Sequence, residues 1–133
     1  MIAVVLLACS RPVAAAQAAP EAEAQQALTA WLLLWDAGKY DESYDGLAEH
    51  AKKDVSRAQW LQYWTNVRKP LGKVVSRKLY EAKHVDSLPT IPDRDGAMIQ
   101  YVSSFETKSG ALETIGMVHE RDGVWRVAAY IVK

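Results

Sequence analysis

The sequence predicts an α+β fold in which three N-terminal helices pack on a curved, four-stranded antiparallel sheet. Two observations lead to this prediction. Apolar residues recur at helical spacing as far as Pro70, whereas runs rich in Val, Ile, Tyr and Thr follow Gly72. A strongly bent sheet wrapped around three helices would form a cone with a pocket at its wide end.

The composition is that of one ordinary domain preceded by an apolar leader. The 133 residues carry 16 basic and 16 acidic side chains, and this balance argues against a nucleic-acid partner. Fifteen of the 19 residues from Met1 to Ala19 are apolar. We therefore predict an export signal and tail over residues 1–19 and a single α+β domain over residues 20–133.

The leader supports two alternative processing routes. The apolar run Met1–Cys9 is too short for a transmembrane helix but fits the core of a bacterial export signal. No basic residue precedes Arg11, so we expect the true start to lie upstream. Leu6-Leu7-Ala8-Cys9 resembles a lipobox, which would anchor the protein to a membrane through lipidated Cys9. Cleavage after Ala14-Ala15-Ala16 or Ala16-Gln17-Ala18 would instead release it into the periplasm or medium.

Three helices are predicted, over residues 21–37, 40–51 and 56–69. The third has the clearest start, because Ser56 and Gln59 can form a capping box. Four tryptophans fall on the apolar stripes of the first and third helices, and we expect them to pack in the core: Trp31, Trp35, Trp60 and Trp64.

Four strands are predicted, over residues 74–85, 97–106, 111–120 and 125–132. Lys108-Ser109-Gly110 and Asp122-Gly123 are the expected hairpin turns, the second of the left-handed two-residue kind. Apolar residues occupy both alternating sets of positions in the last strand. This pattern is typical of a sheet covered on both sides and suggests a homodimer.

No motif for nucleotide, metal or nucleophilic chemistry is present. Cys9 is the only cysteine, and His50, His84 and His119 lie at least 34 residues apart. We therefore expect no metal site, no cofactor and no recognisable catalytic set.

Charged residues inside strand-like runs are the best candidates for a site. Arg77 has the same parity as Leu79, and Glu113 alternates with Ile115, so both could point toward the helices. There they would form either a structural ion pair or part of a pocket. As a general base, Glu113 would need a donor such as Tyr101 or Tyr44, and a neighbouring Arg77 would weaken that base. The candidate pocket residues are Arg77, Glu113, Tyr101, Tyr44, Asp36 and Tyr40.

The order of several motifs resembles a bacterial exported family, the domain of unknown function 4019. The motifs are Trp31-Leu32-x-Leu34-x-Asp36-x-Gly38-x-Tyr40, Arg68-x-Pro70-Leu71-Gly72, Ser76-Arg77-x-Leu79, Glu113-Thr114 and Asp122-Gly123-x-Trp125-Arg126-Val127-x-x-Tyr130. The loop over residues 90–96 departs from the shorter turn expected of that family. The resemblance implies a cone-shaped fold like nuclear transport factor two and ketosteroid isomerase, and it implies no reaction.

Three functions fit these observations. The leading hypothesis is a non-enzymatic domain of the cell envelope that binds a small apolar ligand or another envelope protein. The second is an isomerase or cyclase that uses a pocket carboxylate. The third is a purely structural subunit of a homodimer.

Overall fold

The computed structural model describes residues 18–133. The predictions on Cys9, the lipobox and the leader's cleavage sites therefore lie outside the described residues, or at their edge. Within the described part, no helix is long and apolar enough to cross a membrane.

The described residues form four α-helices rather than the three predicted. They are α1 (Pro20–Asp36), α2 (Tyr40–Asp45), α3 (Glu49–Asp54) and α4 (Arg57–Tyr63). The second predicted helix is broken at Leu47, which forms a parallel bridge with Val127, and the backbone N–H of Ala48 donates to the Val127 oxygen at 2.7 Å. A backbone N–H used in this way cannot continue a helical ladder, so the segment becomes α2 and α3.

The helix that follows begins as predicted. The Ser56 hydroxyl accepts from the Gln59 N–H at 3.2 Å, and the Gln59 side chain accepts from the Ser56 N–H at 2.9 Å. After α4 the chain continues through a π-helical turn (Trp64–Arg68) and a 3₁₀ turn (Lys69–Leu71). A π turn shifts the following side chains around the helix axis, and here Arg68 is buried.

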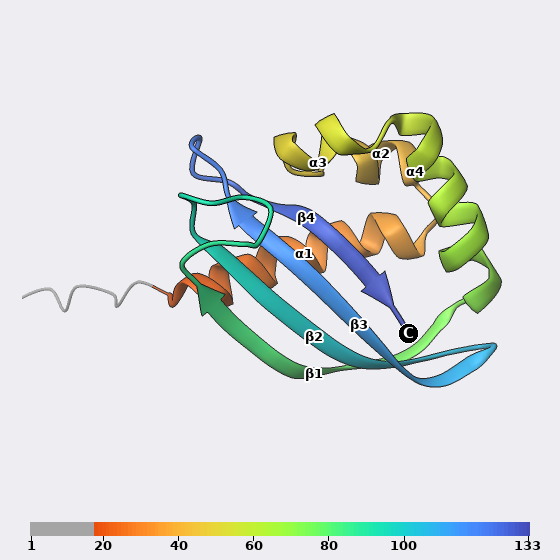
Figure 1. Cartoon of the computed structure of the whole chain (residues 1–133). Coiled ribbons are helices and arrows are strands. Elements are labelled where there is room, and N and C mark those ends of the chain that lie inside the picture. The colour runs from red at the N-terminus through yellow and green to blue at the C-terminus, as the bar shows by residue number, and fades with distance from the viewer. Residues whose placement is uncertain (1–17) are drawn as a thin grey trace, which may run out of the picture.

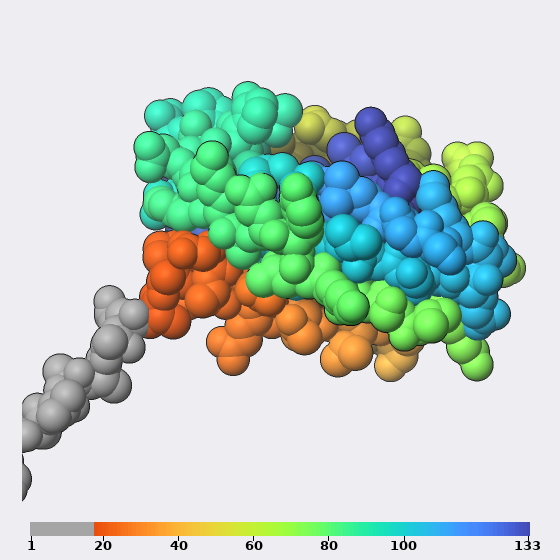
Figure 2. Space-filling model, turned by 90° about the horizontal axis from the view of Figure 1, so that it is seen from below, coloured from red at the N-terminus to blue at the C-terminus, as the bar shows by residue number. Residues whose placement is uncertain are grey.

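The four predicted strands form one antiparallel sheet in the order β1-β2-β3-β4. They are β1 (Val74–Val85), β2 (Gly96–Phe105), β3 (Lys108–His119) and β4 (Trp125–Val132). The α+β class and the four-stranded antiparallel sheet are thus confirmed. Helix α1 crosses one face of the sheet and contacts all four strands, while α2, α3 and α4 lie beside β4 (Figure 1). Edge strand β1 runs beside α1 on the face seen in Figure 2.

The structure differs from the prediction at both hairpin turns. The β2–β3 turn lies at Glu106-Thr107, with Phe105 paired to Lys108, and Gly110 sits inside β3 beyond a register shift with a φ of 64°. A glycine in this conformation accommodates the extra residue of a bulge. In the β3–β4 turn only Gly123 has a positive φ (84°), and the Glu120 N–H donates to the Val124 oxygen across a three-residue loop. A left-handed two-residue turn would need two positive φ values.

A second bulge explains the two-sided apolar pattern of the last strand. The β3–β4 register shifts between Gly116 and Met117, so Val127 and Tyr130 are both buried although their positions have opposite parity. Ala129 and Ile131 are exposed on the other face. The bulge therefore places part of the apolar pattern on the inner face, and the homodimer stays a prediction.

The main core lies between α1, α4 and the sheet and is dominated by aromatic rings. Trp35 is fully buried, and its ring centroid lies 5.4 Å from that of Trp31, 4.8 Å from that of Trp60 and 5.1 Å from that of Tyr130. Three of the four predicted core tryptophans are thus buried. Trp64 is partly buried and donates its indole N–H to the Trp35 oxygen at 3.0 Å.

Candidate functional site

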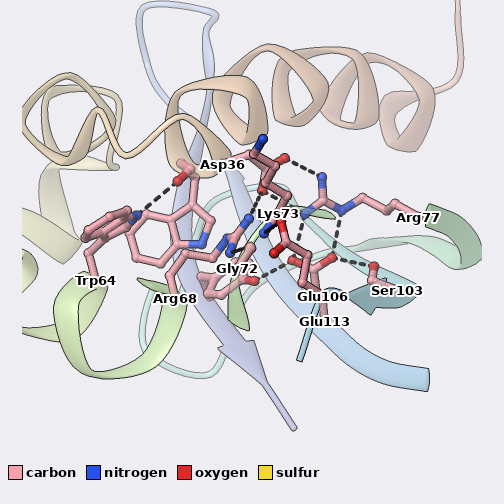
Figure 3. Close-up of polar contacts among 11 residues, drawn as sticks. Asp36, Trp64, Arg68, Gly72, Lys73, Arg77, Ser103, Glu106 and Glu113 are labelled. Atoms are coloured by element: carbon pink, nitrogen blue, oxygen red, sulfur yellow. Dashed lines mark hydrogen bonds and ion pairs between the residues drawn. The ribbon is translucent and has the colours of Figure 1, made fainter. Parts of the chain in front are cut away.

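A buried carboxylate lies at the centre of an ionic network beneath α1 (Figure 3). The Glu113 side chain is fully buried and accepts from Arg77 Nε at 2.7 Å and from Arg77 Nη2 at 3.1 Å. The hydroxyls of Ser103, at 2.5 Å, and Tyr130 also donate to it. A carboxylate has about four lone-pair sites, so the four hydrogen bonds fill those of Glu113.

A second carboxylate shares the same arginine. Asp36, at the end of α1, accepts from Arg77 Nη1 at 2.7 Å and from Arg77 Nη2 at 3.0 Å. Arg68 Nη2 also donates to Asp36, at 3.2 Å, while Arg68 Nη1 donates to the Gly72 oxygen at 2.6 Å. The buried Arg68 guanidinium lies 4.8 Å from the centre of the Phe105 ring. The network therefore contains two carboxylates and two guanidinium groups, which balance in charge.

The sheet register brings the network together. Arg77 on β1 is paired with Ser103 on β2, and Glu113 lies on the next strand, β3. Because Ser103 is small and fully buried, the long Arg77 side chain can reach across β2 to Glu113. A larger side chain at position 103 would occupy that path.

The structure groups three of the six predicted pocket residues in this network and places a fourth beside it. Asp36, Arg77 and Glu113 are bonded to one another, and Tyr101 is paired with Glu113 across β2 and β3. Tyr101 also lines, with Asp36 and Arg77, a cleft of about 310 Å³ between α1 and β1.

The other two predicted residues lie elsewhere. The Tyr44 hydroxyl donates to the Val55 oxygen at 2.8 Å, and the Arg57 guanidinium lies 4.6 Å from the centre of the Tyr44 ring. Tyr40 packs on Trp64 with ring centroids 6.0 Å apart. Tyr44, one of the two tyrosines predicted as a donor for base chemistry at Glu113, therefore makes its hydrogen bond outside the network.

Three members of the network were not predicted: Arg68, Ser103 and Tyr130. Ser103 shares its parity with Tyr101, so strand alternation alone could have placed it on the inner face. Tyr130 could not be found in that way, because the bulge changes the parity of β4. The position of Arg68 depends on the π turn that precedes it.

Burial and charge fix the protonation of two network members. Burial lowers the pKa of Arg77, but hydrogen bonds to Asp36 and Glu113 outweigh this effect and raise that pKa above its usual value. Burial and then the charge of Glu113 raise the pKa of Tyr130 well above its usual value of 10.0. Tyr130 therefore remains a hydrogen-bond donor.

This pKa shift predicts a loss of stability in alkali. The folded state resists ionisation of Tyr130, so its stabilising effect is complete below pH 10.0 and is lost as the pH rises above that value. We expect Tyr130→Phe to cost about 1.5–3 kcal/mol at pH 7, because a hydrogen bond to a charged group is lost. As the pH rises above 10.0, the free energy of unfolding in urea should then fall less steeply for Tyr130→Phe than for the wild type. Tyr80→Phe, at an exposed position, is the control and should follow the wild type. If the free energy of unfolding fell equally steeply with pH for Tyr130→Phe and the wild type, the argument would be contradicted.

An apolar groove is a separate feature of the surface. It has a volume of about 520 Å³ and lies between α3, α4 and β4. Most of its walls are apolar or aromatic, and the two exceptions, Asp54 and Gln59, are exposed. The lining residues are Leu47, Ala51, Asp54, Val55, Gln59, Trp60, Tyr63, Ala128, Ala129, Tyr130 and Ile131.

The described residues do not form a metal centre. Among residues 18–133, no three His, Cys, Asp or Glu side chains gather as ligands of one ion would.

Comparison with known proteins places the chain in a family. The family described as "Protein of unknown function (DUF4019)" matches residues 27–130, which include every member of the ionic network. The chain belongs to this family. The resemblance predicted from the motifs is thus confirmed, and the DUF4019 match also spans all the residues that line the groove except Ile131.

The fold recurs in a protein of known structure. A protein from Catenulispora acidiphila, solved at 2.5 Å, superposes with a TM-score of 0.56 over 84% of this chain and 88% of its own. Sequence identity is 15%, so the likeness concerns the fold alone. No curated protein matches the chain.

Proposed function

We propose that this DUF4019 protein is a non-enzymatic ligand-binding domain of the bacterial cell envelope, and that the groove between α3, α4 and β4 is its binding site. The proposal rests on the size and the lining of this groove. Its volume of about 520 Å³ lies within the ~300–1,000 Å³ range of small-molecule sites, and its lining is mostly apolar.

The hydrogen bonds of the ionic network favour binding over catalysis. An isomerase or cyclase needs a carboxylate that can take a proton from its substrate. All of the lone-pair sites of Glu113 already accept hydrogen bonds from Arg77, Ser103 and Tyr130. We therefore assign the network a structural role, in which it ties α1 to β1, β3 and β4.

The envelope location and the finer description of the fold belong to the same proposal. The apolar leader, with either a lipobox ending at Cys9 or small-residue cleavage sites, supports export. Mass spectrometry of the mature N-terminus distinguishes a diacylated Cys9 from a start at Gln17 or Ala19. Helix α1 lying across the sheet supports a cone-shaped fold like that of nuclear transport factor two.

Filling the groove should abolish binding. Ala51 lines the groove from α3, and in Ala51→Leu the larger side chain would occupy the space. We expect the neutral fluorescent probe N-phenyl-1-naphthylamine to bind the wild type. It should bind Ala51→Leu at least about tenfold more weakly, since the leucine fills the space in which the probe would bury its apolar surface. Fluorescence titration measures both affinities.

A matched control separates this effect from a general change in the protein. Ala58→Leu makes the same substitution at an exposed position of α4 that does not line the groove, and it should bind as the wild type does. Absence of binding to the wild type, or equal binding by Ala51→Leu, would refute the proposed site.

A further inference from the structure

The aromatic residues of the groove have their polar ends bonded within the protein. Trp60 donates its indole N–H to the Ser43 hydroxyl at 2.9 Å, and the Tyr63 hydroxyl donates to the Tyr130 oxygen at 2.9 Å. The Tyr130 hydroxyl donates to Glu113. Trp60 and Tyr130 are buried and their rings pack on Trp35 in the core. Tyr63, which is only partly buried, is therefore the lining residue that can offer a ligand an aromatic ring face. Such a face carries negative electrostatic potential.

The charge of the groove has a single sign. Among the described residues that line it, Asp54 is the only charged one, and no Lys, Arg or His is present. Two of the neighbouring cations bind elsewhere: Lys52 donates to the Asp45 oxygen at 2.8 Å, and Arg57 contacts the Asp45 carboxylate at 2.6 Å. The Asp54 side chain is 68% exposed, with His50 Nε2 at 3.6 Å.

We propose that the groove binds an organic cation, namely an apolar molecule that carries a substituted ammonium group. This inference rests on the proposed function and specifies its ligand class. Tyr63 supplies the aromatic surface that attracts such a cation, and Asp54 supplies the opposite charge. An anionic ligand would gain no partner in the lining and would be repelled by Asp54.

Three probes with the same alkyl chain test the ligand's charge. Octyltrimethylammonium, 1-octanol and octyl sulfate are titrated into the protein by calorimetry at pH 8. The two surfactants are kept below their micelle concentrations, and 1-octanol is kept below its solubility limit. We expect the ammonium to bind about tenfold more tightly than the sulfate, with the alcohol between them, because only the cation is attracted by both the Tyr63 ring and the Asp54 carboxylate.

Two variants test the role of Asp54. Asp54→Asn should weaken octyltrimethylammonium binding about threefold and leave 1-octanol binding unchanged, as expected for one exposed charge. Because Asp54 is exposed at the end of α3, this substitution should not disturb folding, which circular dichroism verifies. Glu42→Gln removes an exposed carboxylate from α2 outside the groove and should bind all three probes as the wild type does.

The outcomes distinguish this inference from the proposed function. Equal binding of the three probes, or tighter binding of octyl sulfate, overturns the inference that the ligand is a cation. The proposed function of the groove as an apolar binding site would then still stand. If neither these probes nor N-phenyl-1-naphthylamine binds, both proposals fail. If the apparent affinity falls as protein concentration rises, with light scattering showing a dimer, the groove is covered by a second copy and the inference is overturned.

Discussion

Replacing Glu113 with alanine is expected to lower the free energy of unfolding by about 3–5 kcal/mol, the usual cost of breaking a buried ion pair from one side. The variant leaves Arg77 with only Asp36 as an anionic partner and removes the acceptor for Ser103 and Tyr130. Urea denaturation followed by tryptophan fluorescence measures the change. Exposed Glu81→Ala on β1 is the control and should stay within about 0.5 kcal/mol of the wild type.

A double variant tests whether the loss of charge balance causes this fall in the free energy of unfolding. In Glu113→Met with Arg77→Met, Asp36 and Arg68 remain as a neutral pair at 3.2 Å. Removing one carboxylate together with one guanidinium should therefore cost less than the sum of the two single substitutions. Strict additivity would show that Arg77 and Glu113 stabilise the fold independently.

Trp35→Ala should also lower the free energy of unfolding by about 3–5 kcal/mol, because it leaves a large cavity among aromatic rings that cannot readily move to fill it. Trp35 is fully buried and stacks on Trp31, in the same helix, while contacting Trp60 and Tyr130 from other elements. Thermal and urea unfolding measure the loss.

The comparison for this variant lies in the same helix. Leu33 is 68% exposed, so Leu33→Ala makes a large-to-small change in α1 without opening a cavity. If Trp35→Ala costs no more than Leu33→Ala, the aromatic cluster does not hold α1 to the sheet as described.

The features that could be predicted from the sequence depend on local patterns. Alternating apolar residues identify the strands, and Ser56 with Gln59 identifies the start of α4. The same alternation gives Arg77 and Glu113 a common face, and their contact follows because β2 places a small Ser103 between them. Position along the strand is enough to predict the common face of Arg77 and Glu113, whereas their contact also depends on how the three strands pair.

The features that could not be predicted depend on irregularities that only tertiary contacts determine. The bulge in the β3–β4 pairing turns Tyr130 inward and brings it to Glu113. The bridge between Leu47 and Val127 divides the second helix and places α3 against β4. Because the groove is formed by α3, α4 and β4, no sequence pattern alone could have revealed it.

The most direct test of the account is to map where a ligand binds. In ¹⁵N-labelled protein titrated with N-phenyl-1-naphthylamine, we predict that amide chemical shifts change around Ala51, Trp60 and Ala129 in the groove. The amide chemical shifts of Arg77 and Glu113 should stay unchanged, since the network is assigned a structural role. Shifts concentrated at Arg77, Glu113 and Tyr101 would contradict the account and place the site at the buried carboxylate.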